Sequence, residues 1–124
     1  MYILEKDFRF EAAHKLPHHD GKCARLHGHS WMMTVRVEGV YTHMKGPKQG
    51  MVMDYGDLKD LVNPLVEECL DHHYLNETTK LDNPTSEELA RWVYERLEKV
   101  ISQAGGFRCN LTAVMIQETC TARC

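Results

Sequence analysis

Residues 27–38 read HGHSWMMTVRVE, and this stretch decides the fold because two kinds of side chain alternate along it. In a β-strand, residues two apart point to the same face of the sheet. The stretch therefore predicts a strand with one apolar face, which begins at two histidines and comprises His27, His29, Trp31, Met33, Val35 and Val37. The opposite face carries Gly28, Ser30, Met32, Thr34, Arg36 and Glu38.

A second alternating stretch, residues 8–14 with the sequence FRFEAAH, predicts another strand. His14 stands at its far end and continues the face of the two phenylalanines. Between the two strands, residues 17–26 (PHHDGKCARL) contain turn formers and predict a loop. If the two strands pair as a hairpin, His14 comes to lie next to His27 and His29.

Two further strands and two helices follow. Residues 51–55 (MVMDY) predict a short third strand, and residues 109–118 predict a last one. Residues 57–70 change to a helical period, in which one apolar stripe is formed by Leu58, Leu61, Val62, Leu65, Val66 and Cys69. Pro64 lies inside this stripe, so we expect a kink there or a break near Asn63.

The second helix has clear boundary signals. The segment Thr85-Ser86-Glu87-Glu88 fits a capping box, and Gly105 is a suitable stop. The apolar face of this helix consists of Leu89, Trp92, Val93, Leu97, Val100 and Ile101. The resulting order, β-β-β-α-α-β, accounts for residues 1–124, and a chain of this length forms one domain.

The composition excludes several classes of protein. Hydrophobic residues make up 43% and charged residues 27%, as in ordinary globular domains, so disorder is not expected. A formal net charge of −3 gives no reason to expect a nucleic acid or a membrane as partner. No apolar run approaches a membrane span, and the start, MYILEKDFRF, lacks the plan of a signal peptide, so we expect a cytoplasmic protein. In that compartment its five irregularly spaced cysteines are expected to be thiols.

The three histidines predict a metal site. Three neutral imidazoles and one open position are the ligand set of a catalytic zinc, and zinc suits imidazole better than magnesium or calcium does. The alternative is that His14, His27 and His29 are surface or capping histidines in a chain that has eight. Cys23 has three interpretations: a fourth ligand of a structural zinc, a thiolate that acts beside the metal, or an inert thiol.

Two other stretches carry groups that can handle protons or bind a ligand. Residues 70–76 (LDHHYLN) place Asp71 beside His72, and a carboxylate that orients an imidazole is typical of proton transfer. The alternative is that the histidine lies at a helix C-terminus only because the helix dipole favours it there. Glu118, at the end of the last strand, could accept two N–H groups from a flat heterocycle, or it could be an exposed charge at a strand end.

Six motifs occur in one order along nearly the whole chain: F-x-F-x-A-A-H (8–14), C-x-x-L-H-G-H-S (23–30), G-M-V-M-D-Y-x-x-L-K (50–59), L-D-H-H-Y-L-N (70–76), N-P-T-S-E (83–87) and E-T-C-T-A (118–122). In these six motifs and their order, the chain closely resembles the family of 6-pyruvoyl-tetrahydropterin synthase and 6-carboxytetrahydropterin synthase. The spacing of C-x-x-L-H-G-H is similar to the bacterial branch that makes 6-carboxytetrahydropterin for queuosine and other deazapurines.

The resemblance implies a role for each candidate residue. The zinc ion would be held by His14, His27 and His29. Cys23 would be the general base, with His72, oriented by Asp71, as the partner acid/base. The pterin ring would be anchored by Glu118, with Thr85 and Ser86 as weaker candidates for neighbouring contacts.

The resemblance also implies a fold and a reaction. The fold would be the α+β tunnelling fold, an antiparallel four-stranded sheet with two helices on one face, whose subunits join into a β-barrel as a trimer or a dimer of trimers. Active sites would lie between subunits. The substrate would be 7,8-dihydroneopterin triphosphate, converted without nicotinamide or flavin. The alternatives are 6-pyruvoyl-tetrahydropterin formation or aldol cleavage on the same scaffold, and a non-catalytic zinc or pterin-binding module.

Overall fold

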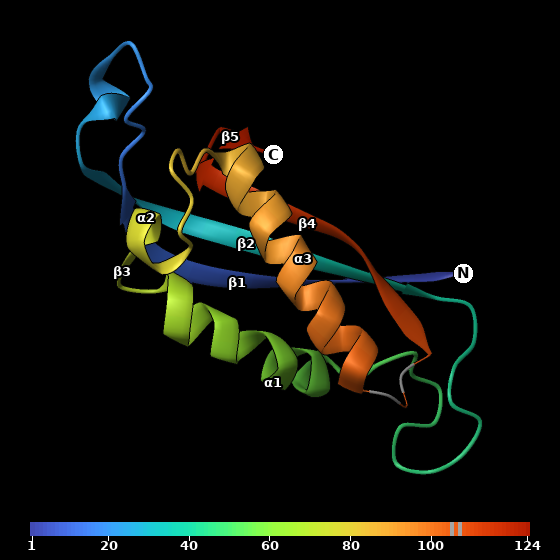
Figure 1. Ribbon diagram of the computed structural model, residues 1–124. Helices are drawn as coiled ribbons and strands as arrows, with labels where there is room; N and C mark the ends of the chain where they lie inside the picture. The colour runs from blue at the N-terminus through green and yellow to red at the C-terminus, as the bar shows by residue number, and fades with distance from the viewer. Residues whose placement is uncertain (105, 107) are drawn as a thin grey trace.

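Five strands form one sheet in the order β3-β1-β2-β4-β5 (Figure 1). The computed structural model describes residues 1–104, 106 and 108–124. The strands are β1 (Tyr2–His14), β2 (His27–Gly39), β3 (His73–Tyr74), β4 (Cys109–Thr119) and β5 (Ala122–Arg123). Neighbouring strands are antiparallel except β3, which runs parallel to β1. The long strands β1 and β2 pair along their whole length, which confirms the predicted hairpin.

The prediction of a four-stranded antiparallel sheet is wrong in two respects. Residues 51–55 do not form a strand: Met51–Asp54 belong to a loop, and Tyr55 already begins a helix. Val52 and Met53 are consecutive and both buried, so this apolar run anchors a loop in the core instead of alternating between two faces. The strands β3 and β5 were missed because two residues are too few to show an alternation.

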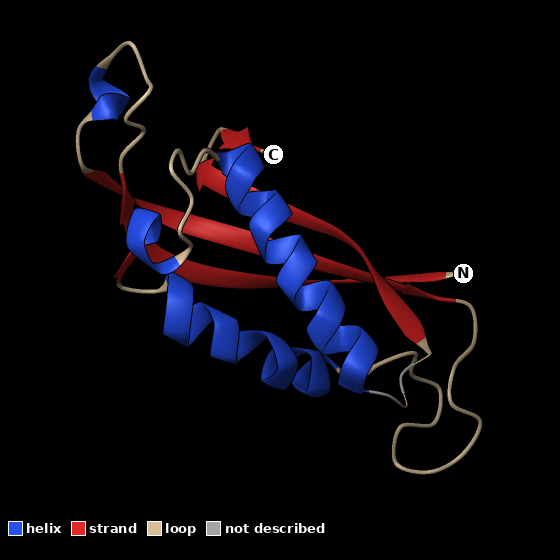
Figure 2. Cartoon of the chain, in the orientation of Figure 1, coloured by secondary structure: helices blue, strands red, loops and turns tan. Residues whose placement is uncertain are grey.

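The helical segments are η1 (Lys22–Ala24), α1 (Tyr55–Leu65), the π-helical turn η2 (Val66–Leu70), α2 (Leu75–Thr78) and α3 (Ser86–Ala104), drawn in blue in Figure 2. Pro64 does not break the helix near Asn63, because α1 runs through both residues. Instead the helix widens directly after the proline, where Asp71 N–H donates to the Val66 carbonyl at 2.7 Å. Because Pro64 has no N–H, the helix lacks one i→i−4 hydrogen bond at this position, and it continues without a break into the π-type turn that begins two residues later.

Thr85 caps α3, as the sequence predicts. Its Oγ1 accepts a hydrogen bond from Glu88 N–H at 3.3 Å. The second half of the capping box differs, because the Glu88 carboxylate contacts Arg91 and the Thr85 N–H donates to the Asn83 carbonyl at 2.8 Å. The predicted stop, Gly105, lies outside the described residues.

The core lies between one face of the sheet and the helices α1 and α3 (Figure 1). The sheet contributes the predicted face of β2, and Trp31, 1% exposed, stacks on Phe10 with ring centroids 5.9 Å apart. Fully buried helix residues pack against it: Leu58, Val62, Leu89, Val93 and Leu97.

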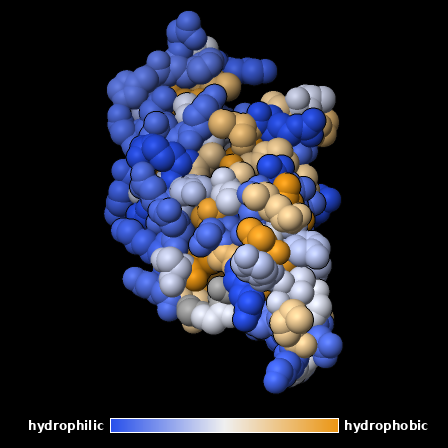
Figure 3. Space-filling view, turned by 90° about the vertical axis from the view of Figure 1, so that its right-hand side faces the viewer, coloured by the Kyte–Doolittle hydropathy of each residue, from blue (hydrophilic) through white to orange (hydrophobic). Residues whose placement is uncertain are grey.

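Seen from the side, one flank of the molecule is almost wholly hydrophilic, whereas the other mixes apolar and polar side chains (Figure 3). No helix in the described part of the chain combines the length and the hydropathy of a membrane span.

Truncation of Leu97 should test whether α3 holds the core. Leu97 is 0% exposed, so Leu97→Ala should lower the free energy of unfolding by about 2–5 kcal/mol through lost burial and a residual cavity. Val100, one turn further along the same helix, is 38% exposed, and Val100→Ala should cost less than about 1 kcal/mol. Urea unfolding with a chelator present measures both; equal losses would show that the buried face of α3 is misassigned.

Candidate metal centre and its surroundings

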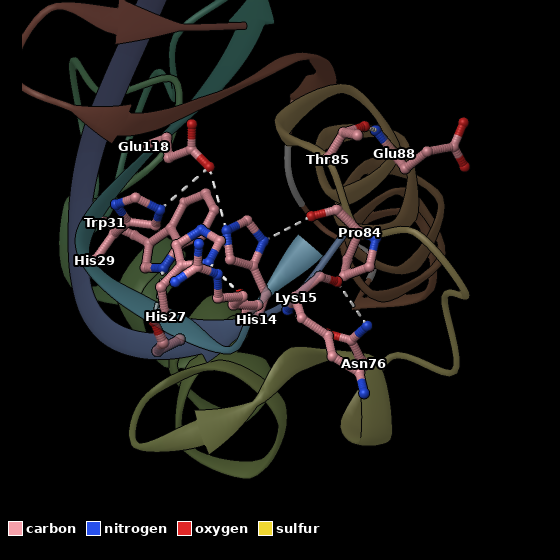
Figure 4. A network of polar contacts seen from close by, with 12 residues as sticks. His14, Lys15, His27, His29, Trp31, Asn76, Pro84, Thr85, Glu88 and Glu118 are labelled. Atoms are coloured by element: carbon pink, nitrogen blue, oxygen red, sulfur yellow. Dashed lines mark hydrogen bonds and ion pairs between the residues drawn. The ribbon is translucent and has the colours of Figure 1, made fainter. Parts of the chain in front are cut away.

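Three imidazoles meet where β1 and β2 end their pairing (Figure 4). His14 lies opposite His27, and His29 lies two pairs further along β2, on the same face of the sheet. Ring centroids are 4.6 Å apart for His14 and His27, 5.2 Å for His14 and His29, and 4.9 Å for His27 and His29. The structure therefore brings the three predicted ligands together at the end of the core-facing surface.

Backbone carbonyls fix the orientation of two of these rings. His14 Nδ1–H donates to the Pro84 carbonyl at 2.9 Å, and His27 Nδ1–H donates to the Arg25 carbonyl at 2.7 Å. A carbonyl only accepts, so each bond requires the proton on Nδ1, and in a neutral ring this leaves the lone pair on Nε2. This is the arrangement in which histidines bind metals, with the second nitrogen held by a backbone acceptor.

The Nε2 atoms of His14 and His29 are buried and have no hydrogen-bond partner among the described residues. Glu118, on β4, points at both: its Oε1 lies 3.3 Å from His14 Nε2 and 3.4 Å from His29 Nε2. Together with His27, these residues offer four ligand atoms that lie within 4.8 Å of one another. Buried polar atoms without a partner are costly, and a divalent cation between them would remove that cost. Three imidazoles and one carboxylate fit zinc.

Burial keeps the two inner imidazoles neutral. It lowers the pKa of His14 below its ordinary value of 6.5, with a smaller opposing effect from the hydrogen bond to Pro84. Burial likewise lowers the pKa of His29, although the nearby Glu118 carboxylate opposes it. Only the neutral form of a histidine can bind a metal, so the fold itself prepares these side chains as ligands.

Trp31 forms the apolar floor of the cluster. Its ring meets the imidazoles of His14 and His29 edge to face, with centroids 5.0 and 5.2 Å away. Its Nε1–H donates to the Ala12 carbonyl at 3.1 Å, which fixes the indole. The sequence places Trp31 on the histidine face, but only the structure shows that it contacts the imidazoles of His14 and His29.

Asp71 and His72 lie together at the outer edge of β1. Asp71 Oδ2 is 2.9 Å from His72 Nδ1, as predicted, and Asp71 Oδ1 accepts from Glu11 N–H at 2.9 Å. The latter hydrogen bond, followed by the contact with His72, lowers the pKa of Asp71. His72 has a positive φ of 58° and donates its N–H to the Glu11 carbonyl at 2.6 Å. The pair is thus anchored to the backbone of β1, although neither residue belongs to the histidine cluster.

Two hollows border the cluster and share His29. One, of about 520 Å³, is lined by His29 and His72 and by residues on the sheet face away from the helices, among them Glu11, Ala13, Gly28 and Ser30. The other, of about 420 Å³, is lined by His29, Glu118, Gln117 and Arg9. Both lie within the size range of small-molecule sites.

The remaining predicted residues lie outside the cluster. Cys23 is half-buried in η1, in the loop between β1 and β2, where its carbonyl accepts from Leu16 N–H at 2.9 Å. Thr85 uses its hydroxyl to cap α3, and Ser86 is the first residue of that helix. Sequence reasoning missed Pro84, whose carbonyl holds His14, because a backbone acceptor leaves no mark in the sequence.

Comparisons with known proteins identify the family of the chain. Residues 3–124 match the sequence model of the family described as 6-pyruvoyl tetrahydropterin synthase. The chain belongs to this family. A relative from Synechocystis, named 6-carboxy-5,6,7,8-tetrahydropterin synthase, is 48% identical over 98% of the chain and 90% of its own length. A relative from Pyrococcus furiosus, named dihydroneopterin monophosphate aldolase, is 41% identical over 73% of the chain and 69% of its own length.

A solved structure of a family member shows the same fold. The 6-pyruvoyl tetrahydropterin synthase of Caenorhabditis elegans superposes with a TM-score of 0.80 and 28% identity, over 99% of this chain and 92% of that one. The architecture is therefore that of the family, with a mixed sheet and helices in an α+β arrangement.

The buried imidazoles should make the metal-free protein sensitive to acid. Below pH 6.5 the unfolded chain protonates its histidines, whereas the lowered pKa values of His14 and His29 keep these residues neutral in the folded state. The unfolded state then binds more protons, so the free energy of unfolding should fall as the pH drops from 7.5 to 5.5. Denaturant unfolding with a chelator at several pH values measures this slope.

The variant His14→Gln should show a shallower slope than the unmodified chain, because it removes the most deeply buried imidazole. As a control, His19→Gln changes a histidine in the loop whose side chain is 40% exposed, and the slope should stay as it was. An identical slope in the chain with and without His14 would contradict the assignment.

Proposed function

We propose that the chain is a zinc-dependent 6-carboxy-5,6,7,8-tetrahydropterin synthase, a carbon–carbon and carbon–oxygen lyase of queuosine and deazapurine biosynthesis. It would convert 7,8-dihydroneopterin triphosphate and one molecule of water to 6-carboxytetrahydropterin, and release acetaldehyde and triphosphate. The observation that carries the proposal is the convergence of three imidazoles beside Glu118, in a chain 48% identical to a relative of that name. The site provides nitrogen ligands, a carboxylate and two adjoining hollows.

In this proposal the zinc ligands are His14, His27 and His29 through their Nε2 atoms. The ion would act as a Lewis acid for the side-chain hydroxyls of the substrate and stabilise negative charge that develops on them. The protein groups would have separate tasks. The carbonyls of Pro84 and Arg25 hold two imidazoles in the binding tautomer. Trp31 excludes water from beneath the cluster.

Glu118 would anchor the pterin. The guanidine-like edge of a pterin presents two N–H groups side by side, and a carboxylate accepts such a pair well. Its position in the hollow of about 420 Å³, next to Gln117 and within reach of the metal ligands, supports this role. Thr85 and Ser86 remain weaker candidates for pterin contacts, since the Thr85 hydroxyl is already engaged at the start of α3.

Proton transfer would be carried out by Cys23 and by the Asp71–His72 pair. Cys23 would remove a proton from the substrate side chain, and His72 would exchange protons on the other side. The 2.9 Å contact between Asp71 and His72 Nδ1 supports the second role, because it orients the ring and leaves Nε2 for the substrate. A non-catalytic zinc or pterin-binding module would not need this set.

We further propose a homo-oligomer, a trimer or a dimer of trimers with active sites between subunits, in the cytoplasm. In the described residues, β1 pairs with β3 only at Ala12 and Ala13, so the outer edge of its first half is free. Exposed apolar side chains near this edge and the loop that follows β2 are Met1, Tyr2, Ile3, Val40, Tyr41, Met44, Met51 and Tyr55. Unpaired edges invite strand addition, and closure of a barrel removes them.

Product analysis distinguishes this activity from its alternatives. The zinc-loaded protein is incubated with 7,8-dihydroneopterin triphosphate, and pterins and acetaldehyde are quantified by mass spectrometry. We expect a 6-carboxypterin species with stoichiometric acetaldehyde. A pyruvoyl product without acetaldehyde would assign the chain to the 6-pyruvoyl branch. Aldol cleavage of the substrate side chain would favour an aldolase activity, the class for which the Pyrococcus relative is named, and absence of turnover would favour a binding module.

Replacement of Cys23 separates a base from a metal ligand. The variant Cys23→Ala should bind one zinc per chain, like the unmodified protein, because the residue lies outside the ligand cluster. Turnover should fall about 10²–10⁴-fold, the usual contribution of a general acid or base. Cys124→Ala, at an exposed cysteine, is the matched control and should keep full activity. Loss of zinc from Cys23→Ala would identify Cys23 as a ligand of a structural site.

A further inference from the structure

The point where β1 leaves the sheet is held by a side chain from elsewhere in the chain. The pairing of β1 with β2 ends at His14 and His27, and Lys15 is the first residue beyond it. From there a loop runs to Leu26 and carries Cys23. Lys15 thus connects a metal ligand to the loop of the proposed base, without a strand partner of its own.

Asn76 takes the place of that missing partner. Lys15 N–H donates to Asn76 Oδ1 at 3.1 Å, and Asn76 Nδ2–H donates to the Lys15 carbonyl at 2.9 Å (Figure 4). A side-chain amide is the group that can satisfy both, since it has an acceptor and a donor side by side. The strand β3 pairs with Ala12 and Ala13 just before this point, so the side chain of Asn76 extends that edge to Lys15, two residues beyond the last pair.

The same side chain is linked to the segment that orients His14. Asn76 Nδ2 also approaches the Asp82 carbonyl at 3.5 Å, and Pro84, two residues later, accepts the hydrogen bond from His14 Nδ1 at 2.9 Å. Further out, His18 of the loop contacts Asp82 through an Nε2–Oδ2 pair at 2.5 Å. The segment around residues 76–84 therefore contacts His14 at the end of β1, and Lys15 and His18 in the loop that follows.

We propose that Asn76 is a positioning residue: its amide fixes the Lys15 backbone and thereby sets the direction of His14 Nε2 and the root of the Cys23 loop. The inference rests on the proposed function for its catalytic consequence, but its structural part concerns the ligand cluster alone. Without the amide, the chain beyond His14 gains freedom, and the imidazole samples directions that a metal cannot use.

The variant Asn76→Asp tests this with the smallest change in shape. The carboxylate keeps the acceptor for Lys15 N–H but loses the donor for the Lys15 carbonyl, and Asn76→Ala loses both. We expect the affinity for Co²⁺, titrated against a chromophoric chelator, to fall about 10–100-fold, as for other groups that orient metal ligands. The d–d absorption of bound Co²⁺ should also change, because the ligand geometry changes.

A second measurement needs neither metal nor pterin. Hydrogen exchange of the Lys15 amide, followed by NMR on the metal-free chain, should be faster by about tenfold or more in Asn76→Ala, whereas amides in α3 should exchange as before. The matched control is Asn110→Asp, the same substitution at an exposed position of β4, which should change neither the exchange nor the Co²⁺ spectrum.

The outcomes separate this inference from the proposed function. Unchanged Lys15 exchange and an unchanged Co²⁺ spectrum in both Asn76 variants would overturn the positioning role, whatever the enzyme does with pterins. Loss of the fold, seen as loss of far-ultraviolet circular dichroism in both variants, would also overturn the positioning role, because Asn76 would then be required for folding of the whole chain. Altered exchange and spectrum in a chain that does not turn over the pterin would support the positioning role and refute the activity.

Discussion

The register of the β1–β2 pairing is the constraint on which the rest of the structure depends. It places His14 opposite His27 and Phe10 opposite Trp31, so that ligands and core side chains share one face. A slip of one residue would turn one strand's histidines away from the cluster and expose its apolar side chains at the same time. Burial of the stacked Phe10 and Trp31 thus stabilises the register and, through it, the geometry of the histidines.

That register buries polar nitrogen atoms of the histidines, and the surrounding residues satisfy only some of these atoms with hydrogen bonds. The Nδ1 atoms of His14 and His27 are satisfied by backbone carbonyls, but the Nε2 atoms of His14 and His29 are buried without a hydrogen bond among the described residues. A protein retains such groups when they have a task, because an apolar side chain would pack there at lower cost. The incompletely hydrogen-bonded polar cluster at the end of a well-packed core is therefore the strongest physical argument for a bound cation.

Long periodic patterns made most of the fold and the clustering of the three histidines predictable. The strands β1, β2 and β4 and the helix α3 each bury one face, and the three histidines lie on such faces. Residues 51–55 were misread because an apolar loop anchor resembles a short strand. The roles of Pro84 and Asn76 were not predictable, since their hydrogen bonds to His14 and Lys15 join residues 70 and 61 positions apart.

In the proposed function, the exposure of the His72 side chain connects the assembly of subunits with proton transfer. Its side chain is 79% exposed in the single chain, whereas an imidazole that exchanges protons with a substrate needs a site from which bulk water is excluded. Asp71 and His72 are anchored to Glu11, next to the free outer edge of β1. A strand from a second subunit added at that edge would cover His72 and extend the hollow it shares with His29. Strand addition would then complete the site as well as remove the unpaired edge.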